Sequence, residues 1–539
     1  MQSTMMTRPL LLDDILERAA RQYPDTEIVS NMPDKSRHRY TYRDFYKRAR
    51  QLSQALVNAG LKREERVATL MWNHYAHLEA YFGIPGAGGV LHTLNLRLAP
   101  DDIAWIANHA SDRFLIVDDV LLPLLEKFAD KVNFERIFVV SLTDQAIPEG
   151  MESYEDFISE PADDFVYPDK DENDGCGMCY TSGTTGNPKG VLYSHRSTCL
   201  HSLVSALPDG MALSARDCVL PVVPMFHANA WGLPYSATLC GLKQVFPGPH
   251  MDAPSLLELF EEEKVNLAGG VPTIWMAIIE ALEAEPQRWK LPKMRMLVGG
   301  SAVPESMIRR FDKFDLSIIQ AWGMTETSPL ASMARLKPAF DDADEDARYK
   351  QRATAGFAAP FVDVRIQDDD GNILPWNGED VGEIQCSGPW ITAKYFDLDK
   401  SEDKFTDDGW LRTGDIAAID RHGYIRITDR TKDVIKSGGE WISSVQLENE
   451  IMAHDKVAEA AVIARPHPKW GERPLACVVK KSGADLTADE VMNFLRGRME
   501  KWMLPEAVTF IDEVPRTSTG KFNKLGLRQQ FEDWDWEAA

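Results

Sequence analysis

The sequence predicts an α/β protein in which a large N-terminal domain is followed by a small α+β domain. The chain has 539 residues, more than one hydrophobic core usually supports, so at least two domains are expected. In the first half, helical patterns alternate with short apolar runs, which is typical of β-sheets covered by helices. The pattern changes near residue 355 and again near residue 430. These observations predict an N-terminal domain at 1–430, with a β-rich subdomain at about 355–428, and a C-terminal domain at 431–539.

The first half contains clear signals for individual elements. Residues 41–44, Thr-Tyr-Arg-Asp, read as the start of a helix, because a hydroxyl followed three residues later by a carboxylate can satisfy free backbone donors. Apolar residues then recur at helical spacing at Phe45, Ala49, Leu52 and Leu56. Residues 66–71 and 113–118 are apolar runs, which we interpret as buried strands.

The stretch from about 355 to 428 consists of short β runs, among them 362–366 and 382–385. Turn signals separate these runs at Asp370-Gly371, Asp408-Gly409 and His422-Gly423. This texture predicts a β-barrel-like subdomain.

The pattern restarts after residues 429–433. Ser444 is expected to cap a helix, residues 457–464 and 475–479 are expected to be strands, and a capping box begins the next helix at Thr487. No low-complexity linker precedes this module, so the domains should be joined by a tight hinge.

Composition narrows the class of protein. Lysine and arginine total 59 against 83 acidic residues, a net charge of −24, which argues against a nucleic-acid-binding protein. Seven cysteines are too few for a disulfide framework in a chain of this length. Cys176 and Cys179 form a CxxC without a second pair, so we favour a structural role over redox or metal chemistry.

The N-terminus has a short apolar run that Asp13 and Asp14 interrupt, so no signal peptide is expected. No stretch of about 18 uncharged apolar residues is present, so no membrane span is expected. These features favour the cytoplasm.

Residues 180–190, YTSGTTGNPKG, point to phosphate binding. Glycines let backbone N–H groups approach an anion, and the hydroxyls supply further donors. A Walker loop is excluded, because Gly186 is followed by Asn-Pro before Lys189. The apolar residues on both sides argue against the alternative of a solvated surface loop. The predicted contacts are Thr181, Ser182, Gly183, Thr184, Thr185, Gly186 and Lys189.

This stretch resembles the phosphate loop of the adenylate-forming superfamily, which contains acyl-CoA synthetases, peptide-synthetase adenylation domains and beetle luciferases. Five further segments are similar to that family's motifs and follow in the family's order. Six such segments, together covering residues from about 20 to 525, leave little room for chance agreement. The five are 299–304 (GGSAVP), 321–327 (AWGMTET), 410–415 (WLRTGD), 429–440 (DRTKDVIKSGGE) and 515–521 (PRTSTGK).

The resemblance implies an ATP site. Glu326 and Thr185 would hold Mg²⁺ against the phosphates, and Asp415 would bind the ribose hydroxyls with help from Arg430. The remaining nucleotide contacts implied by the family motifs are Gly300, Ser301, Ala302, Ala321, Trp322, Gly323, Met324 and Thr325.

Lys521 is the lysine that the resemblance assigns to adenylation. Attack of a carboxylate on the α-phosphorus of ATP brings two anions together, so a divalent cation and a lysine would both stabilise the transition state. An isolated loop lysine is ordinarily solvated, and only the surrounding PRTSTGK motif favours the catalytic interpretation.

A second half-reaction, with coenzyme A, is implied by the same resemblance. The C-terminal domain would rotate about Lys432, a position that is acidic in many relatives, and bring Lys436 to the site with its neighbours. The residues assigned to this step are Lys432, Lys436, Ser437, Gly438, Gly439, Glu440 and Trp441.

The acid site is implied by residues 224–231, PMFHANAW, which look like the fatty acyl-CoA synthetase branch. There His227 would lie beside the acyl carboxylate and Trp231 would gate an acyl tunnel, with Gly299 and Gly323 completing the substrate site. Ordinary core packing is the alternative for Trp231. Within the branch, the chain most resembles 3-methylmercaptopropionate-CoA ligases, while medium- and long-chain fatty acids stay open as substrates.

The sequence therefore predicts an acid–thiol ligase that uses ATP, Mg²⁺ and coenzyme A and releases AMP and pyrophosphate. A luciferase-like oxygenase and a non-catalytic nucleotide sensor are the alternatives; a sensor would be expected to lack Lys521 or Glu326. No GxSxG motif surrounds Ser182 or Ser301, so a serine hydrolase is excluded. A homodimer is implied by the resemblance alone.

Overall fold

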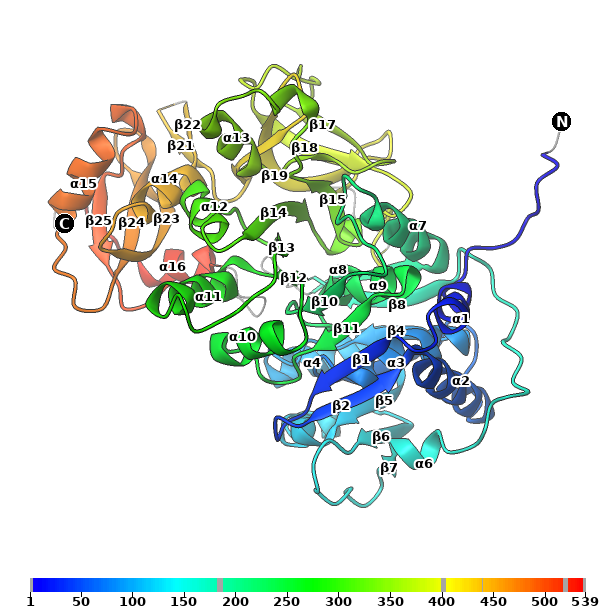
Figure 1. The fold of residues 1–539 in the computed structure, drawn as a ribbon. Coiled ribbons are helices and arrows are strands. Elements are labelled where there is room, and N and C mark those ends of the chain that lie inside the picture. The colour runs from blue at the N-terminus through cyan, green and yellow to red at the C-terminus, as the bar shows by residue number, and fades with distance from the viewer. Residues whose placement is uncertain (1–2, 182–187, 399–403, 439, 517–521, 537–539) are drawn as a thin grey trace.

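The structure is a computed structural model that describes residues 3–181, 188–398, 404–438, 440–516 and 522–536. It is an α/β fold built from four sheets, two large ones in the N-terminal part and two smaller ones after residue 360 (Figure 1).

The first large sheet has seven strands in the order β7-β6-β5-β3-β4-β8-β9. All neighbours are parallel except β9, which runs antiparallel to β8. The two buried strands that the sequence predicts are confirmed as β3 and β5. The strands are β3 (Arg66–Leu70), β4 (Val90–Thr93), β5 (Asp112–Asp118), β6 (Arg136–Val140), β7 (Glu152–Ser153), β8 (Gly175–Tyr180) and β9 (Gly190–Ser194).

The second large sheet has nine strands in the order β16-β15-β14-β13-β12-β10-β11-β1-β2. Its six central strands are parallel, and β2, β15 and β16 join its edges antiparallel. The strands are β1 (Glu27–Asn31), β2 (Arg37–Thr41), β10 (Cys218–Pro221), β11 (Lys243–Phe246), β12 (Leu267–Gly270), β13 (Met294–Val298), β14 (Leu316–Gly323), β15 (Leu330–Met333) and β16 (Phe357–Ala358).

Helices cover these sheets, and the best-predicted one is α2. The Thr41 backbone N–H donates to the Asp44 carboxylate at 2.9 Å, and the Thr41 hydroxyl accepts from the Asp44 N–H, so the capping box is confirmed. The helices of this part are α1 (Leu12–Gln22), α2 (Tyr42–Asn58), α3 (Tyr75–Gly86), α4 (Pro100–Ala110), α5 (Leu122–Leu125), α6 (Tyr154–Phe157), α7 (His195–Ala206), α8 (Ala228–Trp231), α9 (Leu233–Cys240), α10 (Ala253–Glu262), α11 (Pro272–Ala284), α12 (Glu305–Asp312) and α13 (Glu345–Arg352). Short 3₁₀ turns are η1 (Asp119–Leu121), η2 (Ala129–Lys131), η3 (Thr325–Thr327), η4 (Pro338–Phe340) and, further along, η6 (Lys501–Met503).

The stretch predicted to be β-rich contains a four-stranded antiparallel sheet in the order β17-β18-β19-β20. Its turns use Gly371, Gly409 and Gly423 at φ of 88°, 85° and 83°, the left-handed region that favours glycine. The strands are β17 (Asp363–Gln367), β18 (Gly382–Ser387), β19 (Leu411–Ile419) and β20 (Ile425–Arg430).

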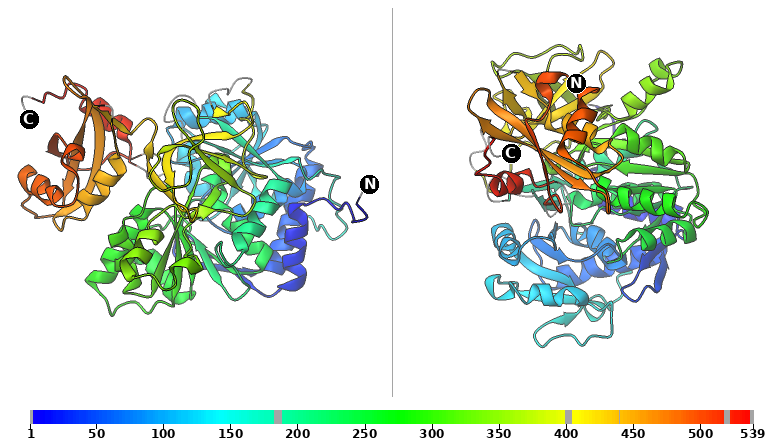
Figure 2. Two further views of the ribbon diagram at one scale, coloured as in Figure 1. Left: turned by 90° about the horizontal axis from the view of Figure 1, so that it is seen from above. Right: turned by 90° about the vertical axis from the view of Figure 1, so that its left-hand side faces the viewer.

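The C-terminal part forms a fourth sheet, and Figure 2 shows it as a separate body beside the rest of the molecule. The predicted strands at 457–464 and 475–479 are confirmed, as is the capping box at Thr487. The elements are β21 (Ile435–Ser437), β22 (Glu440–Ile442), β23 (Val457–His467), β24 (Gly471–Lys480), β25 (Ala507–Phe510), α14 (Ser444–Met452), α15 (Ala488–Arg496) and α16 (Lys524–Gln530).

The predicted cap of α14 is wrong by one residue. Ser443 is the extended residue that precedes the helix, and its side chain accepts from the Gln446 N–H at 3.0 Å. Ser444 is the first helical residue, so its hydroxyl cannot cap and instead donates to the Asp429 carboxylate at 2.6 Å.

The C-terminal part has an apolar core of its own, which includes Ile435, Leu447, Val462 and Leu495, all fully buried. Among the described residues, no helix is both long enough and apolar enough to cross a membrane.

Candidate functional site

The predicted phosphate loop connects β8 to β9, the antiparallel pair at the edge of the seven-stranded sheet. Its base is closed by two hydrogen bonds: the Thr181 N–H donates to the Lys189 carbonyl at 2.9 Å, and the Lys189 N–H donates to the Thr181 hydroxyl at 3.0 Å. The central contacts predicted for the loop, Ser182, Gly183, Thr184, Thr185 and Gly186, lie outside the described residues.

Tyr395 lies between Lys189 and Glu326: its ring contacts the lysine and its hydroxyl contacts the carboxylate. The Lys189 ammonium lies 4.9 Å from the ring centroid, and the Tyr395 hydroxyl donates to Oε1 of Glu326 at 2.6 Å. Glu326 lies in η3 and is 5% exposed. Among the described residues, its second oxygen, Oε2, accepts no hydrogen bond and so is available to a ligand. Tyr395 is not among the predicted site residues, because nothing in the local sequence around this loop tyrosine distinguishes it.

Three of the predicted nucleotide contacts come together around one carboxylate. Asp415 on β19 accepts from the Trp322 indole N–H at 2.8 Å, and its other oxygen lies 3.2 Å from Nε of Arg430. The Asp415 carboxylate raises the pKa of Arg430. Because Trp322 lies in β14 and Arg430 ends β20, this cluster joins the nine-stranded sheet to the four-stranded sheet.

The predicted adenine segment follows β13. The Val303 N–H donates to the Gln320 side chain at 3.1 Å, which ties the segment of Gly300, Ser301 and Ala302 to β14. This places the segment next to Ala321, the start of the neighbouring motif.

At the end of β14 and in the turn that follows, two stretches of backbone lie close together. A Cβ on Gly323 would lie 1.6 Å from the Pro329 carbonyl oxygen, so no other residue fits there without a shift of the backbone. The next turn is held by the Met324 N–H, which donates to the Thr327 hydroxyl at 2.9 Å, and by the Tyr193 hydroxyl, which donates to the Thr325 carbonyl at 2.8 Å.

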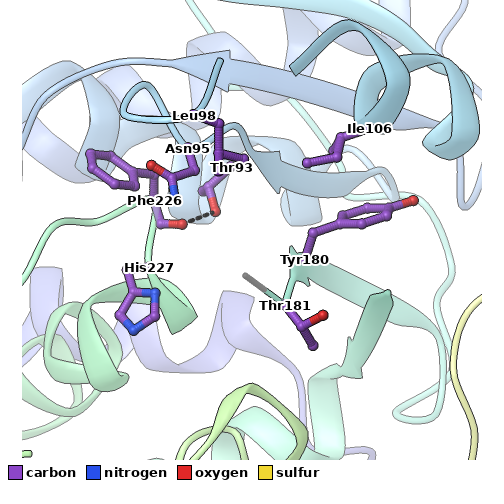
Figure 3. Close-up of a pocket in the computed structure, with 8 residues that line it drawn as sticks. All are labelled: Thr93, Asn95, Leu98, Ile106, Tyr180, Thr181, Phe226 and His227. Atoms are coloured by element: carbon purple, nitrogen blue, oxygen red, sulfur yellow. Dashed lines mark hydrogen bonds between the residues drawn. The ribbon is translucent and has the colours of Figure 1, made fainter. Parts of the chain in front are cut away.

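A pocket connects the phosphate loop with the predicted acid site (Figure 3). His227 and Thr181 both line it, together with Tyr180 from β8. The opposite wall comes from β4 and the loop that follows, including Thr93 and Asn95, which are not among the predicted residues. They were missed because they precede the phosphate loop by about 90 residues and carry no motif. The full lining is Thr93, Asn95, Leu98, Ile106, Tyr180, Thr181, Phe226 and His227.

Trp231 ends a turn with an unusual backbone. Residues 228–231 have φ of 42°, 51°, 49° and 57°, so α8 is a left-handed turn made of four non-glycine residues. The Trp231 ring lies against the adenine segment: a Cβ on Gly299 would be 3.3 Å from Cη2 of that ring. A Cβ on Gly269 of β12 would be 3.7 Å from the same ring. The structure therefore brings together Trp231 and Gly299, two of the four predicted substrate residues.

In the predicted thioester segment, the described residues contact other parts of the chain. Nζ of Lys436 lies 3.8 Å from the Asp369 carboxylate and 5.0 Å from the ring centroid of Trp441. The Ser437 hydroxyl accepts from Arg473 at 3.2 Å, and the Gly438 N–H donates to the Trp470 carbonyl at 2.8 Å. In Figure 1, β21 and β22 lie on the side of the C-terminal part that is nearer to α12 and α13, while α15 lies at its outer end.

Lys432 and Glu440 are the remaining described residues that the sequence assigns to the coenzyme A half-reaction. Lys432 follows β20 in a turn, where burial and the neighbouring Arg430 lower its pKa. Glu440 begins β22, while Gly439 and the adenylation lysine, Lys521, lie outside the described residues. Trp470 is an unpredicted neighbour, because only the fold brings the β23–β24 turn against Gly438.

The CxxC cysteines fit the structural role predicted for them. Both are free thiols in β8, with Cys176 and Cys179 each 1% exposed. Burial raises the pKa of Cys176 to about 12 and that of Cys179 to about 11, which opposes formation of a reactive thiolate.

Comparison with known proteins decides the family. Residues 16–396 match the model of the AMP-binding enzyme family, and residues 446–521 match that of the AMP-binding enzyme C-terminal domain. The chain belongs to the AMP-binding enzyme family. This confirms the predicted membership of the adenylate-forming superfamily.

Its relatives include two CoA ligases that match along the whole chain. It is 49% identical to a long-chain-fatty-acid–CoA ligase of Thermus thermophilus, over 99% of this chain and 97% of the relative. It is 43% identical to a 3-methylmercaptopropionyl-CoA ligase of Ruegeria pomeroyi, over 99% of each chain. These relatives confirm the acyl-CoA synthetase branch and the prediction of an AMP-forming acid–thiol ligase.

Among solved structures, the AMP-binding enzyme shares its fold with the anthranilate CoA ligase AuaEII in complex with anthranoyl-AMP. The TM-score is 0.87 at 24% identity, and the match covers 99% of both chains. The predicted α/β fold class is thereby confirmed.

Proposed function

We propose that this enzyme activates a short-chain acid, such as 3-methylmercaptopropionate, as its acyl-adenylate and then transfers the acyl group to coenzyme A, releasing AMP and pyrophosphate. The observation that carries the proposal is the convergence of separate motifs on one region. Lys189 and Glu326 meet at Tyr395, Asp415 joins Trp322 to Arg430, and the pocket beside the phosphate loop contains His227.

In the proposed adenylation step, ATP binds with its phosphates toward the loop after β8 and its ribose toward Asp415. The Asp415 carboxylate can accept hydrogen bonds from the ribose hydroxyls. His227 lies beside the acid, and Lys521 stabilises the charge that develops as the carboxylate attacks the α-phosphorus. Formation of the acid–phosphorus bond displaces pyrophosphate, so the products are acyl-adenylate and pyrophosphate.

Mg²⁺ fits the residues that are present. Within the described ranges, no three His, Cys, Asp or Glu side chains are grouped so that they could hold a metal ion by themselves. Mg²⁺ is commonly bound by one or two protein oxygens together with substrate phosphates. The buried Glu326 carboxylate supplies such an oxygen in Oε2, and Thr185 is proposed as the second ligand. When bound, the ion would neutralise the phosphate charge.

The proposed second step uses a different arrangement of the two parts of the chain. Lys436, Ser437 and Gly438 contact Asp369, Arg473 and Trp470, and none of them reaches the cluster around Asp415. We therefore propose a boundary between residues 430 and 431 and a rotation about Lys432. The rotation delivers the 436–441 segment to the acyl-adenylate, where the coenzyme A thiolate attacks the carbonyl carbon and AMP leaves.

Trp231 supports a short acid. Its ring lies within van der Waals distance of where a side chain on Gly299 would be, so it occupies space beside the proposed acid site. Burying one methylene of the acyl chain is worth about 0.8 kcal/mol. Because the Trp231 ring fills space that a longer chain would need, we expect it to discriminate against longer acids.

The test is formation of acyl-CoA and AMP across methylmercaptopropionate, butyrate, hexanoate, octanoate and palmitate, each with ATP, Mg²⁺ and coenzyme A. We expect the short acids to have the highest kcat/KM. Trp231→Ala should raise kcat/KM for the longer acids relative to butyrate, by about fourfold for each added methylene that the space accepts. Trp376→Ala, at an exposed tryptophan in the β17–β18 connection, is the matched control and should leave the profile unchanged.

Acid-independent AMP release, or no thioester with any acid, would refute the ligase. A wild-type optimum at palmitate would refute the short-chain assignment while leaving the reaction class intact. Oxygen uptake in place of thioester formation would favour the luciferase-like alternative.

Location and assembly complete the proposal. We place the enzyme in the cytoplasm, where ATP and coenzyme A are supplied, and propose a homodimer. Light scattering coupled to size-exclusion chromatography measures the second point directly, and a mass near 60.6 kDa would contradict it.

A further inference from the structure

A buried polar cluster joins the two parts of the chain on either side of the proposed hinge. Asp429 belongs to β20, where it pairs with Ile416 of β19 and is 1% exposed. Ser444 belongs to α14, which packs on β23 in the C-terminal part. Lys432, the proposed hinge, lies between them in sequence.

Three hydrogen bonds cross this hinge directly. Oδ2 of Asp429 accepts from the Ser444 backbone N–H and from the Ser444 hydroxyl, both at 2.6 Å. The Ser443 hydroxyl donates to the carbonyl of Thr428. Hydrogen bonds to an ionised acceptor are stronger than those between neutral groups, and burial strengthens them further.

Lys524 extends the same cluster to α16. Its Nζ donates to the Ser444 hydroxyl at 2.5 Å and lies 2.7 Å from Oε1 of Glu448. Lys524 is 9% exposed and Glu448 is 6% exposed, so neither charge is solvated. Burial by itself lowers the pKa of Lys524, but Glu448 and Asp429 raise it, so the group stays charged.

This cluster connects α16 to the last strand before the hinge. Lys524 opens α16, three residues after Lys521, and through Ser444 it is linked to Asp429 of the β19–β20 pair. Rotation about Lys432 would move Ser444 with α14 while Asp429 stays with β19. The geometry of the Asp429–Ser444 bonds cannot survive that movement, because hydrogen bonds weaken steeply as their angles change.

We propose that Asp429, Ser444 and Lys524 are positioning residues that form a latch across the hinge and hold the C-terminal part in the arrangement used for adenylation. The inference rests on the proposed function, which assigns adenylation to the arrangement in which Lys436 and its neighbours are away from Asp415. The latch would have to open before coenzyme A can react, so it sets the balance between the two half-reactions.

The test compares those half-reactions in variants of the full-length enzyme. Acid-dependent exchange of pyrophosphate into ATP reports adenylation, and thioester formation from supplied acyl-adenylate and coenzyme A reports the second step. Ser444→Ala removes two bonds of the latch, the one that the hydroxyl donates to Asp429 and the one that it accepts from Lys524, and leaves the Ser443 cap of α14 in place. Asp429→Asn removes the charge, and its effect should exceed that of the serine variant.

We expect the ratio of adenylation to thioester formation to fall about tenfold in Asp429→Asn, since a hydrogen bond to a charged group is worth at least that much. Lys524→Met should lower the ratio in the same direction, and Lys524→Arg should restore part of it, because a guanidinium can still donate to Ser444.

The matched control is Arg528→Met. Arg528 also lies on α16, and its ion pair with Asp433 at 2.8 Å does not cross to β20. This variant should leave the ratio within about twofold, because the lost pair is partly exposed and lies on one side of the hinge. Equal losses in both half-reactions for the latch variants, or a raised ratio, would overturn the latch.

Hydrogen exchange separates failure of the latch from failure of the proposed function. In Asp429→Asn, amide exchange at the start of α14 should rise about tenfold, while Arg528→Met should leave it unchanged. This holds whether or not the enzyme makes an acyl-adenylate. Unchanged exchange in Asp429→Asn would refute the latch even if the ligase activity is established.

Discussion

Glu448 makes a prediction about how stability depends on pH. Its carboxylate is buried, lies 2.7 Å from Nζ of Lys524 and accepts from the Val462 N–H at 2.7 Å. Burial raises the pKa of Glu448 from 4.5 to about 7, although the nearby Lys524 opposes the change. Asp429, another carboxylate that acts on this lysine, adds a smaller contribution in the raising direction. The perturbation is Glu448→Gln, which keeps the shape and removes the titration.

The sign and size follow from linkage between proton binding and folding. The folded chain holds the Glu448 proton more tightly than the unfolded chain, so the folded state binds more protons between pH 4.5 and about 7. The contribution of this group to stability is therefore present at low pH and is lost as pH rises through that window. At about 1.36 kcal/mol per pK unit, the loss between pH 5.5 and pH 8 is about 2 kcal/mol.

The assay is native-state hydrogen exchange of the most protected amides in the C-terminal part, measured at pH 5.5 and pH 8. Between pH 5.5 and pH 8, the opening free energy of the wild type should fall by about 2 kcal/mol relative to that of Glu448→Gln. Glu490→Gln is the control, because the Lys456 ion pair lowers the pKa of Glu490 to about 2 and leaves it ionised across the range. A difference for Glu448→Gln that does not change with pH, or that changes in the opposite direction, would refute this reasoning.

The other predictions concern the proposed site and the thiols. Lys521→Ala should lower acid-dependent pyrophosphate exchange by about 10²–10³ and spare thioester formation from supplied acyl-adenylate, and equal losses would contradict the two-step account. Asp415→Asn should raise the KM for ATP by about tenfold, with little change in the KM for the acid, because the ribose hydroxyls lose an ionised acceptor and Arg430 loses its counter-charge; exchange kinetics at varied ATP measure this. Cys176 and Cys179 should stay unmodified by a thiol reagent in the native enzyme at pH 7.5 and react after denaturation, and rapid native labelling of both would show that their burial is wrong.

Local signals made much of the fold predictable from sequence. The capping box at Thr41 and the apolar run in β5 depend on a few adjacent residues, so both could be identified without tertiary information. The error at Ser444 has a local cause as well. Two serines stand side by side, and backbone conformation decides which one caps: Ser443 has the extended φ and ψ of a cap, while Ser444 is already helical.

The contacts within the site join residues that are far apart in the sequence, so the sequence alone could not predict them. The motif around Asp415 could be recognised, but its bond to Trp322 joins strands of two sheets and has no sequence signal. Tyr395 and Lys524 were missed for the same reason. Each acts on a residue at least 69 positions away, and only packing shows that the pair meets.

The left-handed turn at 228–231 offers a route to a more robust catalyst. Alanine in that backbone costs about 1–2 kcal/mol per residue, a penalty that glycine avoids. Ala228 and Ala230 are buried and flank Asn229, so replacing either with glycine changes neither His227 nor Trp231. Glycine loses more conformational freedom on folding than alanine does, which reduces that gain in stability by about 0.5–1 kcal/mol. A strained segment beside a substrate pocket is thus a place where thermal tolerance can be raised by removing single methyl groups.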